Sequence, residues 1–206
     1  MNADMGEKKE KDGPLPSGQR RVRADAQRSL DALLLAAKEV FTEFGVDVPV
    51  RDIADRAGVG LGTVYRHFPT RADLIAAVFR QEMDACADAA AVLASQNSPF
   101  EALAKWMQRF AALVATKRGL AKALHSGDPA FEALRGRFEQ RLRPAFRSLF
   151  DAAVAAGEVR AGIDADELLN AVRSLCMSTH EDRPGHAGRM VALFVDGLRF
   201  GVRDQT

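Results

Sequence analysis

The pattern of apolar and polar positions along the chain first indicates one amphipathic helix. From Arg20 onward, apolar residues recur at intervals of three and four positions, which places them on one face of an α-helix. The residues of this face are Leu30, Leu33, Leu34, Ala37, Val40, Phe41 and Phe44. Gly45 follows directly and is a typical residue at a helix end. We therefore expect a helix that ends at about residue 44.

Start and stop signals divide the rest of the chain into further helices. Two short segments, at about 50–57 and 61–67, are separated only by Gly58-Val59-Gly60, which is long enough for a tight turn alone. A Thr or Ser followed three residues later by Asp or Glu opens later helices, as at Thr70 and Ser98. The expected ranges are about 70–94, 99–116, 118–125, 129–156 and 164–180, with a last helix after Pro184-Gly185.

The same pattern predicts the fold class. No segment alternates apolar and polar residues with a period of two, so no strand is expected. Pro144 should kink the helix over 129–156, because proline lacks the backbone N–H and crowds the preceding turn. We predict an all-α fold of about nine helices.

The composition of the chain indicates a cellular compartment but no binding partner. With 206 residues, 47% of them hydrophobic, the chain can bury a substantial core, and its net charge of +1 predicts no polyanionic partner. Residues 1–18 are charged and rich in turn formers, so we expect a disordered arm there, without a signal core. No apolar run reaches the roughly 20 residues of a membrane helix. Cys86 and Cys176 are isolated, which fits a reducing compartment, and we expect a cytoplasmic protein without a membrane partner.

Residues 50–67 have the properties that a helix-turn-helix requires. Ala54 is small where the two helices must cross closely, and Gly58 stands where the turn needs a positive φ. An apolar wedge between the helices is expected from Ile53, Val59 and Val64. The second helix of such a motif inserts its N-terminal residues into the major groove of DNA.

This segment resembles the DNA-binding motif of the TetR family of transcription regulators. The matching residues are Ile53-Ala54, Gly58-Val59, the run Gly62-Thr63-Val64-Tyr65-Arg66-His67-Phe68, and Arg71. The resemblance is specific over about residues 25–75. It implies a helix-turn-helix domain over residues 19–70 and a C-terminal effector-binding and dimerisation domain over 71–206. One departure is Pro49-Val50, where relatives place Ser or Thr before the second helix.

The resemblance also implies roles for individual residues on a DNA operator. Leu61 and Thr63 would lie near bases, Gly62 would lie on the same DNA-facing side, and Arg66 would reach a guanine edge. Phosphates would be held by Tyr65, His67, Arg51 and Arg71. In addition, four arginines and one aspartate give a local charge of +3, which suits phosphate or minor-groove contact or is a solvated charge run. These residues are Arg20, Arg21, Arg23, Arg28 and Asp25.

For the C-terminal domain the resemblance implies a homodimer and a small-molecule effector. The last two helices would pack against their twins through Leu168, Val172, Leu175, Met190, Phe194 and Leu198. The effector would lie among the central helices, and the candidate residues are Trp106, Met107, Phe110, Phe131, Phe138 and Cys176. A stripe of aromatic and Met residues at helical spacing is also typical of a simple core.

Other functional classes find little support in the sequence. No nucleophile, base and orienting group stand out together, so we expect no catalytic residue. His125 near Asp128, and the cluster His180-Glu181-Asp182 with His186, lack the spacing of a metal site, and no cofactor is expected. We predict a sequence-specific DNA-binding regulator, a repressor released from a palindromic operator by a small molecule. The alternatives are a helical enzyme, or a ligand-free architectural regulator, with an appended DNA-binding domain.

Overall fold

The computed structural model describes residues 17–115, 128–160, 162–177 and 185–199. Within these ranges the chain is helical and contains no strand, which confirms the predicted all-α class. Residues 1–16 of the expected arm, and the predicted helix over 118–125, lie outside the described residues. None of the described helices is long and apolar enough to cross a membrane.

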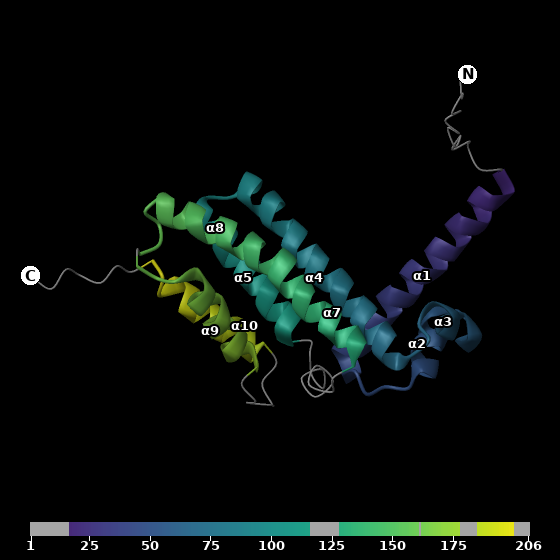
Figure 1. The fold of residues 1–206 in the computed structure, drawn as a ribbon. Coiled ribbons are helices and arrows are strands. Elements are labelled where there is room, and N and C mark those ends of the chain that lie inside the picture. The colour runs from purple at the N-terminus through teal and green to yellow at the C-terminus, as the bar shows by residue number, and fades with distance from the viewer. Residues whose placement is uncertain (1–16, 116–127, 161, 178–184, 200–206) are drawn as a thin grey trace, which may run out of the picture.

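The first three helices form a compact unit at one end of the molecule (Figure 1). They are α1 (Ser17–Phe44), α2 (Val50–Ala57) and α3 (Leu61–His67). Helix α1 ends where the pattern predicts, at Phe44, and Gly45 then takes a φ of 82°. It begins earlier than expected, because Ser17 and Gly18 belong to the helix instead of the arm. The apolar face of α1 packs against α2 through the buried residues Leu33, Ala37, Val40, Phe41, Ile53 and Ala54.

Helix α4 (Arg71–Gln96) joins this unit to the rest of the molecule (Figure 1). It begins at the predicted capping box, in which the Asp73 amide donates to Thr70 Oγ1 at 3.1 Å and the Thr70 amide donates to Asp73 Oδ2 at 3.0 Å. Both bonds satisfy amides that a helix start otherwise leaves without partners. Helix α4 packs against α1 near its start and against α5 along its length. It is therefore a single rigid connection between the two parts.

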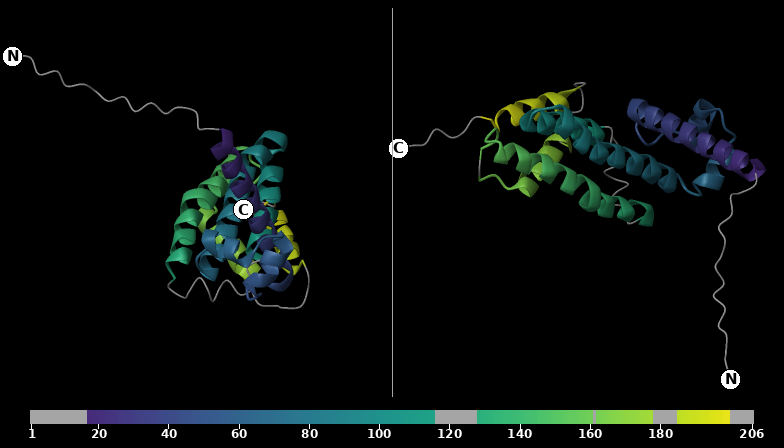
Figure 2. Two further views of the ribbon diagram at one scale, coloured as in Figure 1. Left: turned by 90° about the vertical axis from the view of Figure 1, so that its right-hand side faces the viewer. Right: turned by 90° about the horizontal axis from the view of Figure 1, so that it is seen from above.

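The C-terminal body is built around α5, which packs against α4, α8, α9 and α10. The body lies at the opposite end of the molecule from α2 and α3 (Figure 2). Its elements are α5 (Pro99–Ala115), α7 (Pro129–Arg137), a π-helical turn (Phe138–Leu142), α8 (Arg143–Ala155), α9 (Ala165–Met177) and α10 (His186–Asp196). The core includes Leu103, Trp106, Met107, Phe110, Phe146, Leu149 and Leu169.

The structure corrects the predicted single helix over 129–156. The helix is interrupted by a π-helical turn, in which the Arg143 amide donates to the carbonyl of Phe138, five residues earlier. Pro144 lies at the start of α8, directly after this turn. Because Pro144 has no N–H to donate to the preceding turn, the ordinary ladder is broken at this point. The disturbance expected from Pro144 thus takes the form of a π turn.

Candidate DNA-binding surface

The turn between α2 and α3 is fixed by Gly58. Its φ of 67° and ψ of 28° lie in the left-handed region that glycine adopts without strain. In this conformation the Gly58 amide donates to the carbonyl of Asp55 at 3.2 Å, and the Val59 amide donates to that of Ala54 at 3.0 Å. Both bonds close the end of α2. The predicted need for a positive φ at Gly58 is confirmed.

Apolar side chains between the two helices hold α3 on α2. Val64 of α3 is buried, as are Ile53 and Ala54 of α2, and Val59 of the turn is half-buried against them. Phe68 follows α3 and is also buried. One face of α3 is therefore fixed inward, and the opposite face must point to solvent.

That outer face carries most of the residues predicted to contact DNA. Leu61 is 37% exposed and Tyr65 is 46% exposed. Gly62 and Arg66 are exposed beside them, whereas Thr63 and His67 are half-buried. An aliphatic and an aromatic side chain presented together by a seven-residue helix are typical of a contact surface.

Helices α2 and α3 both begin without a side-chain cap. Pro49 precedes α2 and Gly60 precedes α3, and neither residue provides a side-chain hydrogen bond to its helix. In α3 the Thr63 amide instead donates to the Gly60 carbonyl at 2.8 Å. The departure at Pro49-Val50 noted from sequence is thus a real difference at the start of α2.

Arg51 and Arg71 occupy different environments. Arg51 is exposed on α2, as a phosphate contact requires. Arg71 is half-buried at the start of α4, and its Nη2 donates to the backbone carbonyl of Val46, in the loop between α1 and α2. Sequence reasoning missed this second role of Arg71, because Val46 lies 25 residues away. A guanidinium has five N–H donors, so this bond leaves others for a phosphate.

Ion pairs also fasten the three-helix unit to its surroundings. Lys38 Nζ of α1 lies 2.7 Å from Glu82 Oε1 of α4. Arg56 of α2 lies 3.6 Å from both Glu39 and Glu43 of α1. Together with the Arg71 bond, these contacts make the position of α3 depend on the position of α4.

The sequence and the whole fold match one family of bacterial regulators. The family model for bacterial regulatory proteins of the tetR family matches residues 33–78. The model described as the C-terminal domain of SbtR-like transcriptional regulators matches residues 98–200, which is half of the chain. The chain belongs to the TetR family. It is therefore a DNA-binding transcriptional regulator, and its family and fold are those of regulators and not of enzymes.

Solved TetR structures resemble most of the molecule. The TetR transcriptional regulator SCO0520 from Streptomyces coelicolor is 37% identical with a TM-score of 0.68, over 84% of this chain and 99% of that chain. The TetR regulatory protein from Mycobacterium vanbaalenii is 35% identical with a TM-score of 0.67, over 87% of this chain and 99% of that one. An HTH-type transcriptional regulator of Staphylococcus aureus (strain USA300) is 34% identical over 64 residues. Those residues are 31% of this chain, and the match spans only 35% of that relative.

The effector candidates of this TetR protein lie in or beside its core. Trp106, Met107, Phe110 and Phe131 are buried, and Phe138 is half-buried. The Trp106 ring stacks on Phe110 at 5.5 Å between centroids, and Phe110 lies 6.2 Å from Phe138. Three of the predicted residues thus belong to one aromatic cluster.

Cys176, the sixth effector candidate, is half-buried on α9. Burial raises the pKa of its thiol from the ordinary value of 9.0 to about 11. Cys176 is therefore a neutral, apolar group at physiological pH. The histidines considered as metal ligands, His125 and His180, lie outside the described residues, whereas His186 begins α10.

The dimer candidates divide into two groups. Leu168, Val172 and Leu198 are at most 3% exposed within their own chain, and their role as partner contacts stays a prediction. An apolar stripe in the sequence predicts which residues are buried, but it does not tell whether the same chain or a second copy buries them. Leu175, Met190 and Phe194 are half-buried. Leu193, which sequence reasoning missed, is 68% exposed and borders a groove of about 430 Å³ between α9 and α10, lined by Ile163, Leu168, Ala171, Phe194 and Leu198.

Proposed function

We propose that this regulator is a homodimeric repressor that binds a palindromic operator and is released by a small-molecule effector. The observation that carries the proposal is the outward face of α3, where Leu61, Tyr65 and Arg66 are exposed on a helix that packs on α2. Helix α2 packs on α1, and α1 packs on α4. Because α4 connects the helix-turn-helix to the C-terminal body, a change of conformation in that body can move α3.

On DNA, α3 would enter the major groove with its N-terminal residues foremost. Leu61 and Thr63 would then meet base edges, and the exposed Gly62 would allow close approach of the backbone. Arg66 would discriminate a guanine by a bidentate contact. Tyr65, His67, Arg51 and the remaining donors of Arg71 would contact phosphates on either side of the groove. These contacts position the helix, because phosphates carry no sequence information themselves.

The dimer would form through α9 and α10. Leu193 leaves a large apolar side chain in solvent beside the groove that Phe194 borders, and covering such a surface is favourable. Leu175 and Met190, both half-buried on the same helices, would extend the contact. A twofold dimer of this kind pairs two α3 helices with two half-sites, separated by one DNA turn of roughly 34–36 Å.

The effector would act on α4 through the aromatic cluster. Trp106 Nε1 donates to the carbonyl of Cys86 at 2.8 Å, so the cluster that contains Phe110 and Phe138 is bonded directly to α4. A largely apolar molecule that opened this cluster, and that Met107, Phe131 and Cys176 would also contact, would displace α4 and with it α3. The coupling must be reciprocal, so operator DNA weakens the binding of the effector by the same factor.

Selection from a pool of random DNA duplexes tests the first half of the proposal. We expect enrichment of an inverted repeat whose half-sites are one helical turn apart, bound by a dimer. Enrichment of a non-palindromic sequence by a monomer contradicts it.

For the effector, a metabolite library is screened by melting temperature, because a specific ligand stabilises the folded state. Each ligand found is then titrated with and without the selected duplex. Equal ligand affinity in the two titrations contradicts release by the effector, and a library without any active ligand favours a ligand-free regulator.

A further inference from the structure

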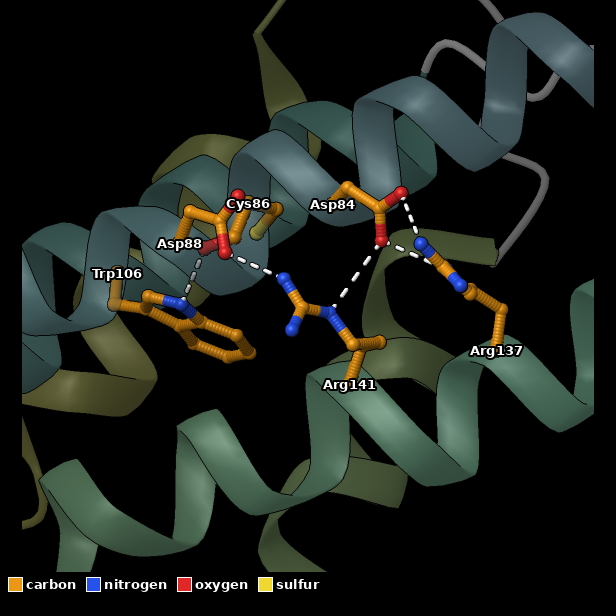
Figure 3. Close-up of polar contacts among 6 residues, drawn as sticks. All are labelled: Asp84, Cys86, Asp88, Trp106, Arg137 and Arg141. Carbon is orange, nitrogen blue, oxygen red and sulfur yellow. Dashed lines mark hydrogen bonds and ion pairs between the residues drawn. The ribbon is translucent and has the colours of Figure 1, made fainter. Parts of the chain in front are cut away.

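Four charged residues form a cluster between α4 and the segment of α7 and the π turn (Figure 3). Arg137 grips Asp84 with two hydrogen bonds, from Nε at 2.7 Å and from Nη2 at 2.5 Å. Arg141 reaches both acidic residues, with Nε 3.5 Å from Asp84 and Nη2 2.5 Å from Asp88. Asp84 raises the pKa of Arg137, so the cluster keeps its cation at every physiological pH.

The spacing of these residues fixes the register of the two segments. Asp84 and Asp88 are one turn apart on α4, and Arg137 and Arg141 are one turn apart on the segment formed by α7 and the π turn. Each matched pair is separated by 53 residues in sequence. An equal separation means that the two segments run parallel and in register. A shift of either segment along the other by less than one turn therefore lengthens both pairs at once.

Helix α4 is also held by α5 at the same level. The carbonyl of Cys86, which lies between Asp84 and Asp88 in sequence, accepts the indole N–H of Trp106 from α5 (Figure 3). Two turns or fewer separate this level from Glu82, which pairs with Lys38 of α1. The orientation that α4 takes at residues 84–88 thus sets where the three-helix unit lies.

The hydrogen-bond pattern of the helix changes between the segment of α7 and the π turn, on one side, and α8 on the other. The π turn and Pro144 interrupt the helical ladder between this segment and α8. π turns inside helices are frequent at functional sites. Phe131, Leu134 and Leu142 of this segment are buried in the same core cluster as Phe146 and Leu149.

We propose that Asp84, Asp88, Arg137 and Arg141 are positioning residues for the DNA-binding helix α3. They hold α4 at the orientation in which α3 engages its operator. The effect on DNA rests on the proposed function, whereas the effect on orientation is a property of the single chain. Asp84 is 26% exposed and Asp88 is 70% exposed, so water reaches the cluster. Pairs with this exposure contribute little to the free energy of unfolding, and the cluster can open without unfolding the protein.

A distance measurement within one chain tests the effect on orientation directly. Spin labels are placed on α2 and α8 at the exposed positions Asp55→Cys and Asp151→Cys, in a background carrying Cys86→Ala and Cys176→Ser. Labelled chains are diluted with unlabelled chains, so that pulsed electron paramagnetic resonance records only the distance between the two labels of one chain. The variant Arg137→Gln/Arg141→Gln should give a broader and displaced distance distribution. A distribution that superimposes on the parent overturns the proposal.

The matched control is Glu132→Gln/Arg135→Gln, which removes a 3.0 Å ion pair within α7 itself. This control should leave the distribution unchanged. If both pairs of substitutions broaden it equally, the cluster has no special role and the proposal fails.

Affinity for the selected duplex separates a positioning role from a merely structural one. The double arginine variant should lose affinity by about 2- to 30-fold, the range found for residues that couple distant sites. Its melting temperature should fall by no more than about 4 °C, as expected for a small change in a chain of this size.

The variant Asp84→Asn/Asp88→Asn should lose the same affinity, and combining all four changes should add little, because the four residues act as one unit. Full additivity, or a loss of melting temperature without a change in distance, contradicts the proposal. A protein that enriches no duplex at all contradicts the proposed function, while the distance measurement still decides the orientation.

Discussion

The indole N–H of Trp106 donates a 2.8 Å hydrogen bond to the backbone carbonyl of Cys86, and this bond joins α5 to α4 inside the core. Trp106 is fully buried and is the only tryptophan of the chain. Trp106→Phe removes the donor and leaves a cavity beside Phe110 and Phe146. We expect the free energy of unfolding to fall by about 2–4 kcal/mol, from both causes together. Urea unfolding followed by circular dichroism measures it, and a change below about 0.5 kcal/mol contradicts the role assigned to the bond.

The turn of the helix-turn-helix offers a matched pair of glycines. Gly58 has a φ of 67° and Gly60 a φ of −69°, and a Cβ built at either position meets no atom within 4 Å. Gly58→Ala should therefore destabilise the protein by about 1–2 kcal/mol through backbone conformation alone. Gly60→Ala should change the free energy of unfolding by less than half of that. Thermal unfolding of both variants checks the prediction, and equal effects contradict it.

A substitution at Gly62 should change the stability of the protein and its affinity for DNA in opposite directions. Gly62 lies within α3, where an added Cβ again meets no atom within 4 Å. Gly62→Ala should stabilise the helix by about 0.5–1 kcal/mol, because alanine loses less backbone entropy than glycine. The same methyl group points toward the groove if α3 docks as proposed, so affinity for the selected duplex should fall. A variant that is more stable and binds DNA as tightly as the parent contradicts the placement of Gly62 at the DNA.

The dimer prediction rests on Leu193. Its side chain is 68% exposed on α10, whereas Leu35, at 58%, is similarly exposed on α1 at the far end of the molecule. Leu193→Glu would bury a charge without a partner in the proposed interface, which is strongly unfavourable. Sedimentation should therefore show monomers for Leu193→Glu and dimers for Leu35→Glu. Dimers in both cases would place the interface elsewhere.

Local signals in the sequence predicted most of the fold. The capping box at Thr70, the end of α1 before Gly45 and the positive φ of Gly58 each depend on one or a few neighbouring residues. The Asp128 side chain caps α7 by accepting from the Ala130 amide at 2.9 Å. Signals of this kind act over a single turn and can be identified without the tertiary structure.

Contacts between distant residues could not be predicted in the same way. The ion pairs of Asp84 and Asp88 span 53 residues, and the Arg71 bond to Val46 spans 25, so no local pattern indicates them. For the dimer candidates the apolar pattern leaves open which molecule covers them. A stripe of apolar residues has the same spacing whether its own chain or a second copy covers it.

The most direct test of the account compares the parent with Tyr65→Ala/His67→Ala on the duplex that the parent selects. Both side chains lie on the outer part of α3, where Tyr65 is exposed and His67 half-buried, so their loss should leave the fold intact. Fluorescence anisotropy titrations should show an affinity about 5- to 150-fold weaker, because two contacts of roughly 0.5–1.5 kcal/mol each are removed. An unaltered affinity of the folded double variant would contradict the docking of α3 on DNA.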